Sequence, residues 1–272
     1  MPSRLDVTRN YVGHGVDTIN AHISNRTIAN SVSYLLPILG ILPPNFTFLD
    51  VGCGPASITI DIAKRYPSAT ILGIDGSPVV ISQARGAAQK ANVHNIHFAV
   101  GDALDLAPTA SEPGFELFKG LCDVVELRSA IKVGGLVCCK EADRACLMMW
   151  PENKAIRRTY DVISAIMEAK GCDPYVGRKL KTYAMAAGFS SNDVRVGQAP
   201  WVVSSREERE NWGGLVARTS ADPEARARIE HEARCIGHEI NLEELHRGWR
   251  HWIEDDTACA SISDIYVVCR KQ

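Results

Sequence analysis

Short apolar runs alternate with amphipathic segments in the first half of the chain. Four runs have the length and composition of strands buried in a parallel sheet: FTFLDVG (46–52), ATILGID (69–75), IHFAVGD (96–102) and GGLVCCKEA (134–142). Two segments between them have helical spacing: SITIDIAKRY (57–66) and SPVVISQARGAAQKAN (77–92). Ser77 and Pro78 are residue types that favour a helix start. This order predicts parallel strands joined by right-handed crossovers.

The second half of the chain is more helical. Amphipathic spacing predicts helices over 152–171, 174–189, 224–240 and 241–254. Ser205 and Glu208 form a capping-box pattern that predicts the start of one more helix. Strands are expected over 192–203 and 264–270, the last at or near an edge of its sheet. A helical segment is also expected over 17–42, before the first strand.

Composition narrows the class of protein. The 272 residues, 46% hydrophobic and 23% charged, can bury a core as one large α/β domain with an elaboration or as two small domains. A net charge of −2 argues against a nucleic-acid partner, and the apolar stretch at 34–42 is too short to cross a membrane. Nine cysteines without a CxxC pair, and a start without a signal-peptide pattern, favour a reducing, cytoplasmic location.

Unusual residues gather at the predicted carboxyl ends of the strands, where ligands of such sheets bind. Asp50-Val-Gly52-Cys-Gly54 follows the first strand, and its glycines allow a ligand close to the backbone. The third glycine of a dinucleotide fingerprint is missing, and no GKS or GKT follows. Asp75 ends the second strand and Asp102 the third. Carboxylates there suit a ribose diol and a purine amine, so the pattern predicts a nucleoside ligand without a pyrophosphate.

Four motifs in order resemble those of class I S-adenosylmethionine-dependent methyltransferases: LDVGCGPAS (49–57), GIDGS (73–77), GDALDL (101–106) and KVGGLV (132–137). The resemblance covers about residues 10–272 and best fits the ubiquinone/menaquinone-biosynthesis-type branch, in small-molecule members of secondary metabolism. It implies a Rossmann-like α/β fold, a doubly wound and mostly parallel sheet with an N-terminal helical lid and a C-terminal helical elaboration. Within one domain, the implied parts are a lid (1–45), a cofactor-binding core (46–145) and a helical cap with the final strands (146–272).

The resemblance implies which residues lie at the methionine end of S-adenosylmethionine. Gly52 and Gly54 would pass beside it, and Asp50 would steady their loop. AHISNRTIANSVSYLLP resembles the family's lid segment and would place Arg26 and Thr27 by the cofactor's carboxylate.

Other implied residues surround the nucleoside. Asp75 would hold the ribose hydroxyls, with Gly76 and Ser77 beside it. Asp102 and Ala103 would line the adenine site. The resemblance also makes Tyr11 a cover over the cofactor: it lies before the lid segment.

The chain departs from the family pattern after the third strand. FELF (115–118) is a shortened fourth strand at most, GLCDVVELRSAIK (120–132) is expected to be helical, and the family's histidines have no counterpart here. No catalytic base is therefore assigned. Three explanations stay open. The chain methylates by positioning alone or with a base from elsewhere; it binds the cofactor for a non-methylating step, such as a cyclisation, or as a non-catalytic subunit; or the sequence reflects an imperfect gene prediction or a splice form.

Two further patterns have a plain structural interpretation. His231, Cys235 and His238 have a spacing that suits a metal, but their segment is charged and no fourth ligand is evident, so a solvated helix is expected and no metal is assigned. Four tryptophans are expected mainly in the core, with one or two able to reach an apolar substrate: Trp201, Trp212, Trp249 and Trp252.

Together these features predict a monomeric or homodimeric S-adenosylmethionine-dependent methyltransferase acting on a small, apolar or aromatic metabolite. Such an enzyme aligns an acceptor with an already activated methyl group and excludes water, with little covalent chemistry of its own. The accepting atom is left open.

Overall fold

The computed structural model describes residues 26–101, 131 and 133–272. Their contacts divide into two compact units. The sheet unit comprises the described part of Ile23–Cys139, with Leu180–Ala199 and Val267–Gln272. The described part of the helical unit is Lys140–Lys179 and Pro200–Tyr266.

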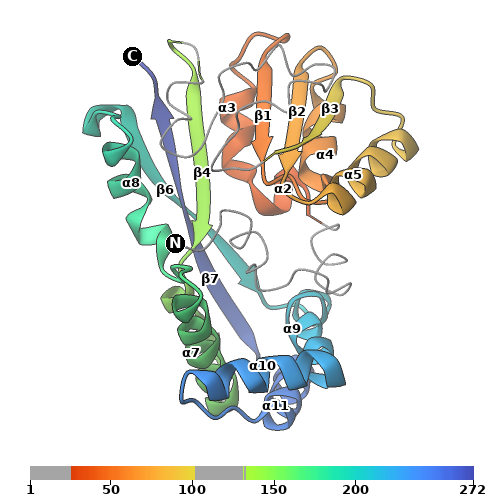
Figure 1. Cartoon of the computed structure of the whole chain (residues 1–272), viewed down its shortest axis with the longest axis vertical. Helices are drawn as coiled ribbons and strands as arrows, with labels where there is room; N and C mark the ends of the chain where they lie inside the picture. The colour runs from red at the N-terminus through yellow and green to blue at the C-terminus, as the bar shows by residue number, and fades with distance from the viewer. Residues whose placement is uncertain (1–25, 102–130, 132) are drawn as a thin grey trace. The chain divides into compact units, whose positions relative to one another are not determined.

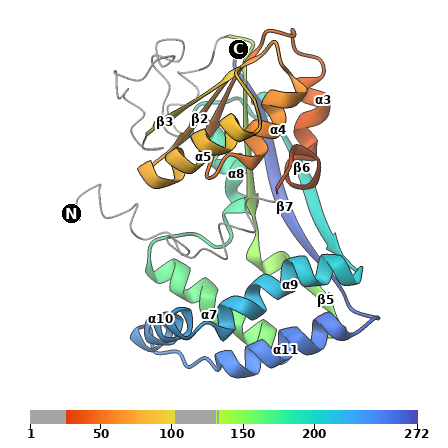
Figure 2. The same ribbon diagram turned by 90° about the vertical axis from the view of Figure 1, so that its right-hand side faces the viewer.

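Three parallel strands form the first sheet, in the order β1-β2-β3 (Figure 1). They are β1 (Thr47–Val51), β2 (Thr70–Asp75) and β3 (Ile96–Val100). Their connections contain α4 (Ser57–Arg65) and α5 (Pro78–Lys90), which lie side by side on one face of the sheet (Figure 2). The predicted alternation of strand and helix is confirmed over this stretch.

The two helices begin in different ways. At α5 the hydroxyl of Ser77 accepts the N–H of Val80, and Pro78 occupies the first turn, as the sequence predicts. At α4 the preceding residue is Ala56, which has left-handed backbone angles (φ 66°, ψ 25°) and provides no side-chain cap. The helices then bury apolar residues against the sheet: Ile60, Ile62 and Ala63 from α4, and Ile81, Ala84 and Ala88 from α5.

The described part of the predicted lid consists of short turns. They are α2 (Ile28–Ser31), a 3-10 turn (Ser33–Leu35) and α3 (Leu36–Leu39). Thr27 caps α2 in a capping box with Asn30. The N–H of Ile28 donates to the Asp61 carboxylate on α4 at 2.9 Å, which ties this segment to the helix that follows the glycine loop.

A second sheet contains β4 (Leu136–Ala142), β5 (Met148–Trp150), β6 (Val194–Val203) and β7 (Cys259–Arg270). β7 lies between β4 and β5 and also pairs with β6, so the last strand is one position in from the edge. β5, antiparallel to β7, was not expected from the sequence because three residues are too few to show a period. β7 also starts earlier than predicted.

Four helices make up most of the helical unit (Figure 2). They are α7 (Lys154–Ala169), α9 (Arg206–Ala221), α10 (Pro223–Cys235) and α11 (Leu242–Glu254). The predicted capping box of Ser205 and Glu208 is present at the start of α9. α11 packs against α9 and α7, and the edge-to-face rings of Trp212, Trp249 and Trp252 fill the space between them. Trp249 and Trp252 are 1% exposed, so both belong to the core.

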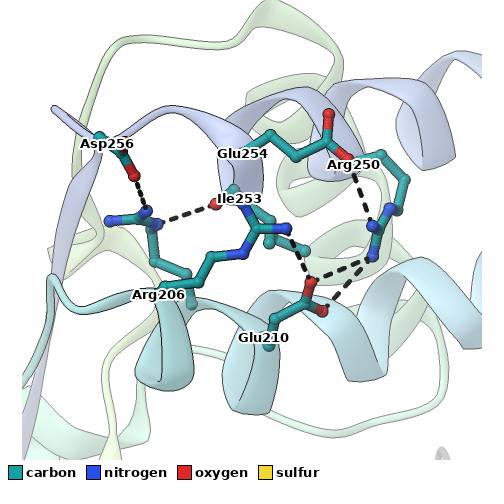
Figure 3. A network of polar contacts seen from close by, with 7 residues as sticks. Arg206, Glu210, Arg250, Ile253, Glu254 and Asp256 are labelled. Atoms are coloured by element: carbon teal, nitrogen blue, oxygen red, sulfur yellow. Dashed lines mark hydrogen bonds and ion pairs between the residues drawn. The ribbon is translucent and has the colours of Figure 1, made fainter.

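A polar network also joins α9 to α11 (Figure 3). Glu210 accepts from Arg206 on its own helix and from Arg250 on α11, at 3.4 Å each. Arg209 is buried and donates to the carbonyl of Ile253 at 2.9 Å. A buried arginine satisfied in this way is part of the scaffold rather than a ligand site.

One predicted helix is much shorter in the structure. The segment 174–189 forms a 3-10 turn (Val176–Lys179) and then α8 (Leu180–Ala186). A Cβ at Gly177 would lie 2.8 Å from the carbonyl oxygen of Glu141, so glycine permits a close approach to the end of β4 there. None of the helices in the described ranges combines the length and apolar composition that a bilayer crossing needs.

Candidate cofactor site

The loop between β1 and α4 turns over the carboxyl end of β2. The N–H groups of Gly52 and Cys53 both donate to the carbonyl of Ile74 at 2.8 Å. Gly52 (φ 75°) and Gly54 (φ 56°) have left-handed angles that glycine adopts without strain. A Cβ on Gly52 would meet no atom of the described residues within 4 Å, so a ligand can approach the backbone closely at this point.

Asp75 joins this loop to the one after β2. Its Oδ2 accepts the N–H of Gly54 at 3.1 Å, and its Oδ1 accepts the N–H of Ser77 at 2.9 Å. Gly76 lies between Asp75 and Ser77 in the sequence and is exposed. A carboxylate offers about four acceptor positions, so each oxygen of the half-buried Asp75 can accept a further bond. The arrangement leaves a fixed carboxylate able to hold two hydroxyl groups.

Asp50, at the end of β1, is held from the other side of the loop. The hydroxyl of Thr59, in the first turn of α4, donates to its Oδ2 at 2.6 Å. Burial raises the pKa of Asp50 above its ordinary value; the bond from Thr59 opposes this shift, and the charge of Asp75 adds to it. Thr59 is fully buried and is not among the site residues that the sequence predicted, although a hydroxyl on the apolar face of SITIDIAKR was a visible signal.

Cys53 lies between the two glycines but provides no nucleophile. Burial raises the pKa of its thiol, and the carboxylates of Asp50 and Asp75 raise it further. Its Sγ would be 3.0 Å from a Cβ placed on Gly73. The thiol is therefore a neutral packing group beneath the loop.

Arg26 has an unsatisfied group in the described structure. Its Nε is buried and has no hydrogen-bond partner among the described residues. Thr27 uses its hydroxyl oxygen to accept the N–H of Asn30, while its own N–H donates to the Asn30 side chain. Arg26 therefore retains binding capacity, whereas Thr27 is largely engaged in the cap of α2.

The structure brings together Asp50, Gly52, Gly54, Asp75, Gly76 and Ser77 at the carboxyl ends of β1 and β2. The other predicted site residues, Tyr11, Asp102 and Ala103, lie outside the described residues, as do the expected fourth strand (115–118) and most of the helix expected over 120–132.

In the described ranges, no group of histidine, cysteine and acidic residues has a metal-binding arrangement. The Sγ of Cys235 lies 3.5 Å from the Nε2 of His231, but α10 ends at Cys235, before His238.

Comparison with known proteins agrees with this geometry. A family profile described as a methyltransferase domain matches residues 42–134, which include the glycine loop and Asp75. The chain is 25% identical to an uncharacterized methyltransferase of Schizosaccharomyces pombe, over 96% of this chain and 97% of the other. These matches support a class I S-adenosylmethionine-dependent methyltransferase. A shorter match is to the trans-aconitate 2-methyltransferase of Methylobacterium radiotolerans, 38% identical over 22% of this methyltransferase and 21% of that protein.

Solved structures share the fold of this methyltransferase. The phosphoethanolamine N-methyltransferase 2 of Haemonchus contortus, determined with phosphomonomethylethanolamine and S-adenosylhomocysteine, aligns with a TM-score of 0.53 at 16% identity. The alignment covers 97% of this chain, which spans 58% of the nematode enzyme. The YcgJ protein of Bacillus subtilis aligns with a TM-score of 0.51 at 13% identity, over 88% of this chain and 97% of that one.

Proposed function

We propose that this methyltransferase moves the methyl group of S-adenosylmethionine onto a small metabolite with an apolar or aromatic body. The observation that carries the proposal is Asp75, held by the backbone N–H groups of Gly54 and Ser77 at the end of β2. A carboxylate fixed in this way matches a ribose diol, which offers two hydroxyl donors at adjacent carbons.

The residues of the loop suit the rest of this cofactor. Gly52 leaves its backbone open, where the methionine part would pass. Arg26 has a buried, unsatisfied Nε that an incoming carboxylate could satisfy. Asp102 and Ala103 are proposed for the adenine end and Tyr11 for a cover, on the family resemblance alone.

When bound, S-adenosylmethionine supplies an activated methyl group on its sulfonium. The residues of the chain then have to hold the cofactor, orient the acceptor and exclude water. No base is assigned in this proposal. Assignment to the ubiquinone/menaquinone-biosynthesis-type branch, a monomeric or homodimeric state and a cytoplasmic location are further parts of it.

Two measurements test the proposal. Calorimetry should show binding of S-adenosylmethionine and S-adenosylhomocysteine by the full chain. Incubation with S-adenosylmethionine and pools of small acids, phenols and amines should release S-adenosylhomocysteine, and mass spectrometry should find products 14 Da heavier than their precursors, because methyl replaces hydrogen. Absence of cofactor binding by a folded chain would remove the proposal, and binding without any product would remove its catalytic part.

A further inference from the structure

A group of arginine and tyrosine side chains lies in the helical unit, where the chain leaves β4. We call Arg144, Tyr160, Tyr175 and their partner Ser164 the Arg144 cluster. Arg144 is in a 3-10 turn (Arg144–Cys146), Tyr160 and Ser164 are on α7, and Tyr175 precedes the next 3-10 turn. All four belong to the same compact unit.

The guanidinium of Arg144 is held in one orientation. Its Cζ lies 4.3 Å from the centre of the Tyr160 ring, and its Nε donates to the hydroxyl of Ser164 at 3.0 Å. Ser164 in turn donates to the carbonyl of Tyr160 at 2.8 Å, which fixes the hydroxyl that receives Nε. These contacts leave both terminal nitrogens of the fork without a hydrogen-bond partner among the described residues.

The positive charge of Arg144 is not balanced within the described structure. Burial lowers the pKa of its guanidinium, and no carboxylate in the described ranges forms an ion pair with it. The neighbouring acid, Asp143, is occupied: it accepts two hydrogen bonds from Arg178 and a third from the N–H of Ala145.

Glu152, another carboxylate of the same unit, is occupied as well. Glu152 receives both the Nε and an Nη of Arg157, at 3.0 and 2.8 Å. Water can reach the terminal nitrogens of Arg144, and an anion could replace this water and supply the counter-charge.

Tyrosine hydroxyls complete the cluster. Tyr160 and Tyr175 are both half-buried and lie within electrostatic reach of Arg144. Within the part of the chain that the structure describes, neither hydroxyl has a hydrogen-bond partner. A guanidinium held in one orientation, with both terminal nitrogens unpaired among the described residues, is the chemistry that recognises carboxylates and phosphates.

We propose that the Arg144 cluster binds an oxyanion, a carboxylate or a phosphate monoester, of a small-molecule ligand. Arg144 provides the counter-charge, the Tyr160 ring stacks against its guanidinium, and Ser164 is a positioning residue that acts through Arg144.

Three probes with the same ring test the proposal: phenyl phosphate, benzoate and the uncharged benzyl alcohol. Each is titrated calorimetrically into the full chain saturated with S-adenosylhomocysteine. The wild type should bind at least one of the two anions more tightly than benzyl alcohol. Arg144→Gln should weaken that anion at least tenfold, about 1.4 kcal/mol, and leave benzyl alcohol unchanged. Preference between phenyl phosphate and benzoate identifies the acidic group.

Arg158→Gln is the matched control. Arg158 is an exposed arginine on α7, so its removal changes the net charge equally without touching the cluster, and it should alter the affinity by less than twofold. Ser164→Ala should weaken the anion less than Arg144→Gln does, and Arg144→Lys, which keeps the charge but loses the fork, should not restore wild-type affinity.

The outcomes are distinct. If neither anion binds better than benzyl alcohol, or if Arg144→Gln and Arg158→Gln behave alike, the proposal is overturned. If Arg144→Gln does not fold by circular dichroism, Arg144→Lys decides: a loss of threefold or more supports the site, and unchanged affinity removes it. The S-adenosylhomocysteine titration is read separately, so a chain that binds this cofactor product but fails the anion test overturns only the present inference.

Discussion

Replacing Asp75 with alanine should weaken cofactor binding and should lower the stability of the fold somewhat less. In the structure each carboxylate oxygen accepts one backbone N–H, from Gly54 or from Ser77, and can accept one more bond. Two ribose hydroxyls would use that capacity. A hydrogen bond to a charged group contributes about 1.5–3 kcal/mol, and water replaces part of it in the variant, so the expected loss is about 1–3 kcal/mol. This corresponds to an affinity about 5- to 150-fold lower.

The cost to stability should be smaller. Gly54 and Ser77 are half-buried, so water can reach their N–H groups once the carboxylate is gone. A loss of about 1–2 kcal/mol in the free energy of unfolding is expected, or roughly 2–8 °C in Tm for a chain of this size.

Isothermal titration with S-adenosylmethionine measures the first effect, and circular dichroism melting measures the second. Asp161→Ala, which removes an exposed carboxylate from α7, is the control and should leave both values near those of the wild type. Asp75→Asn adds a finer test. Its single carbonyl oxygen can accept from Gly54 or Ser77 but not from both, so it should not recover wild-type affinity. Unchanged affinity in a folded Asp75→Ala chain would refute the assignment of this carboxylate to the ribose.

Three further predictions concern the same loop. Thr59→Val keeps the side-chain shape but removes the 2.6 Å hydrogen bond to Asp50. Urea unfolding should therefore show a free energy of unfolding lower by about 1.5–3 kcal/mol. A change below about 0.5 kcal/mol would mean that this bond contributes little. Burial raises the pKa of Asp50 in the folded chain. The contribution of this carboxyl group to the free energy of unfolding is therefore fully present below its ordinary pKa of about 3.9, and it is lost as the pH rises through the folded pKa. Asp50→Asn should accordingly gain stability relative to the wild type between pH 4 and pH 7, and a difference in Tm that is constant with pH would contradict this. Ala56→Gly should change the free energy of unfolding by less than about 1 kcal/mol. Glycine relieves the left-handed backbone strain, and this offsets the lost burial of the methyl group and the added entropy of the unfolded chain. A larger loss in urea unfolding would show that the packing of the methyl group contributes more than the strain costs.

Features that depend only on residues close together in the sequence were predictable. The strands at β1, β2 and β3 follow from apolar runs closed by glycine or aspartate, and the start of α5 follows from Ser77. The glycine loop and Asp75 were predictable for the same reason, because the carboxyl ends of parallel strands meet at one edge. Prediction failed where the pattern was short or interrupted, as at β5 and α8.

Contacts between distant residues could not be predicted in this way. The bond between Gly54 and Asp75 joins residues 21 positions apart, and the Thr59 hydroxyl reaches Asp50 only because α4 folds back over the end of β1. The tryptophans show the same limit, since composition allowed either core or substrate contact and packing placed Trp249 and Trp252 in the core.

The sequence by itself determined the alternation of strand and helix through β3, the resemblance to methyltransferases, and the glycines and carboxylate at the strand ends, because periodicity and turn chemistry act over a few residues. Only the tertiary structure decided which charges are balanced. Asp143 is neutralised by Arg178, while its neighbour Arg144 is stacked on Tyr160 without a counter-ion in the described chain. Desolvation and pairing depend on every group that surrounds a side chain, and folding assembles those surroundings from segments that the sequence keeps apart.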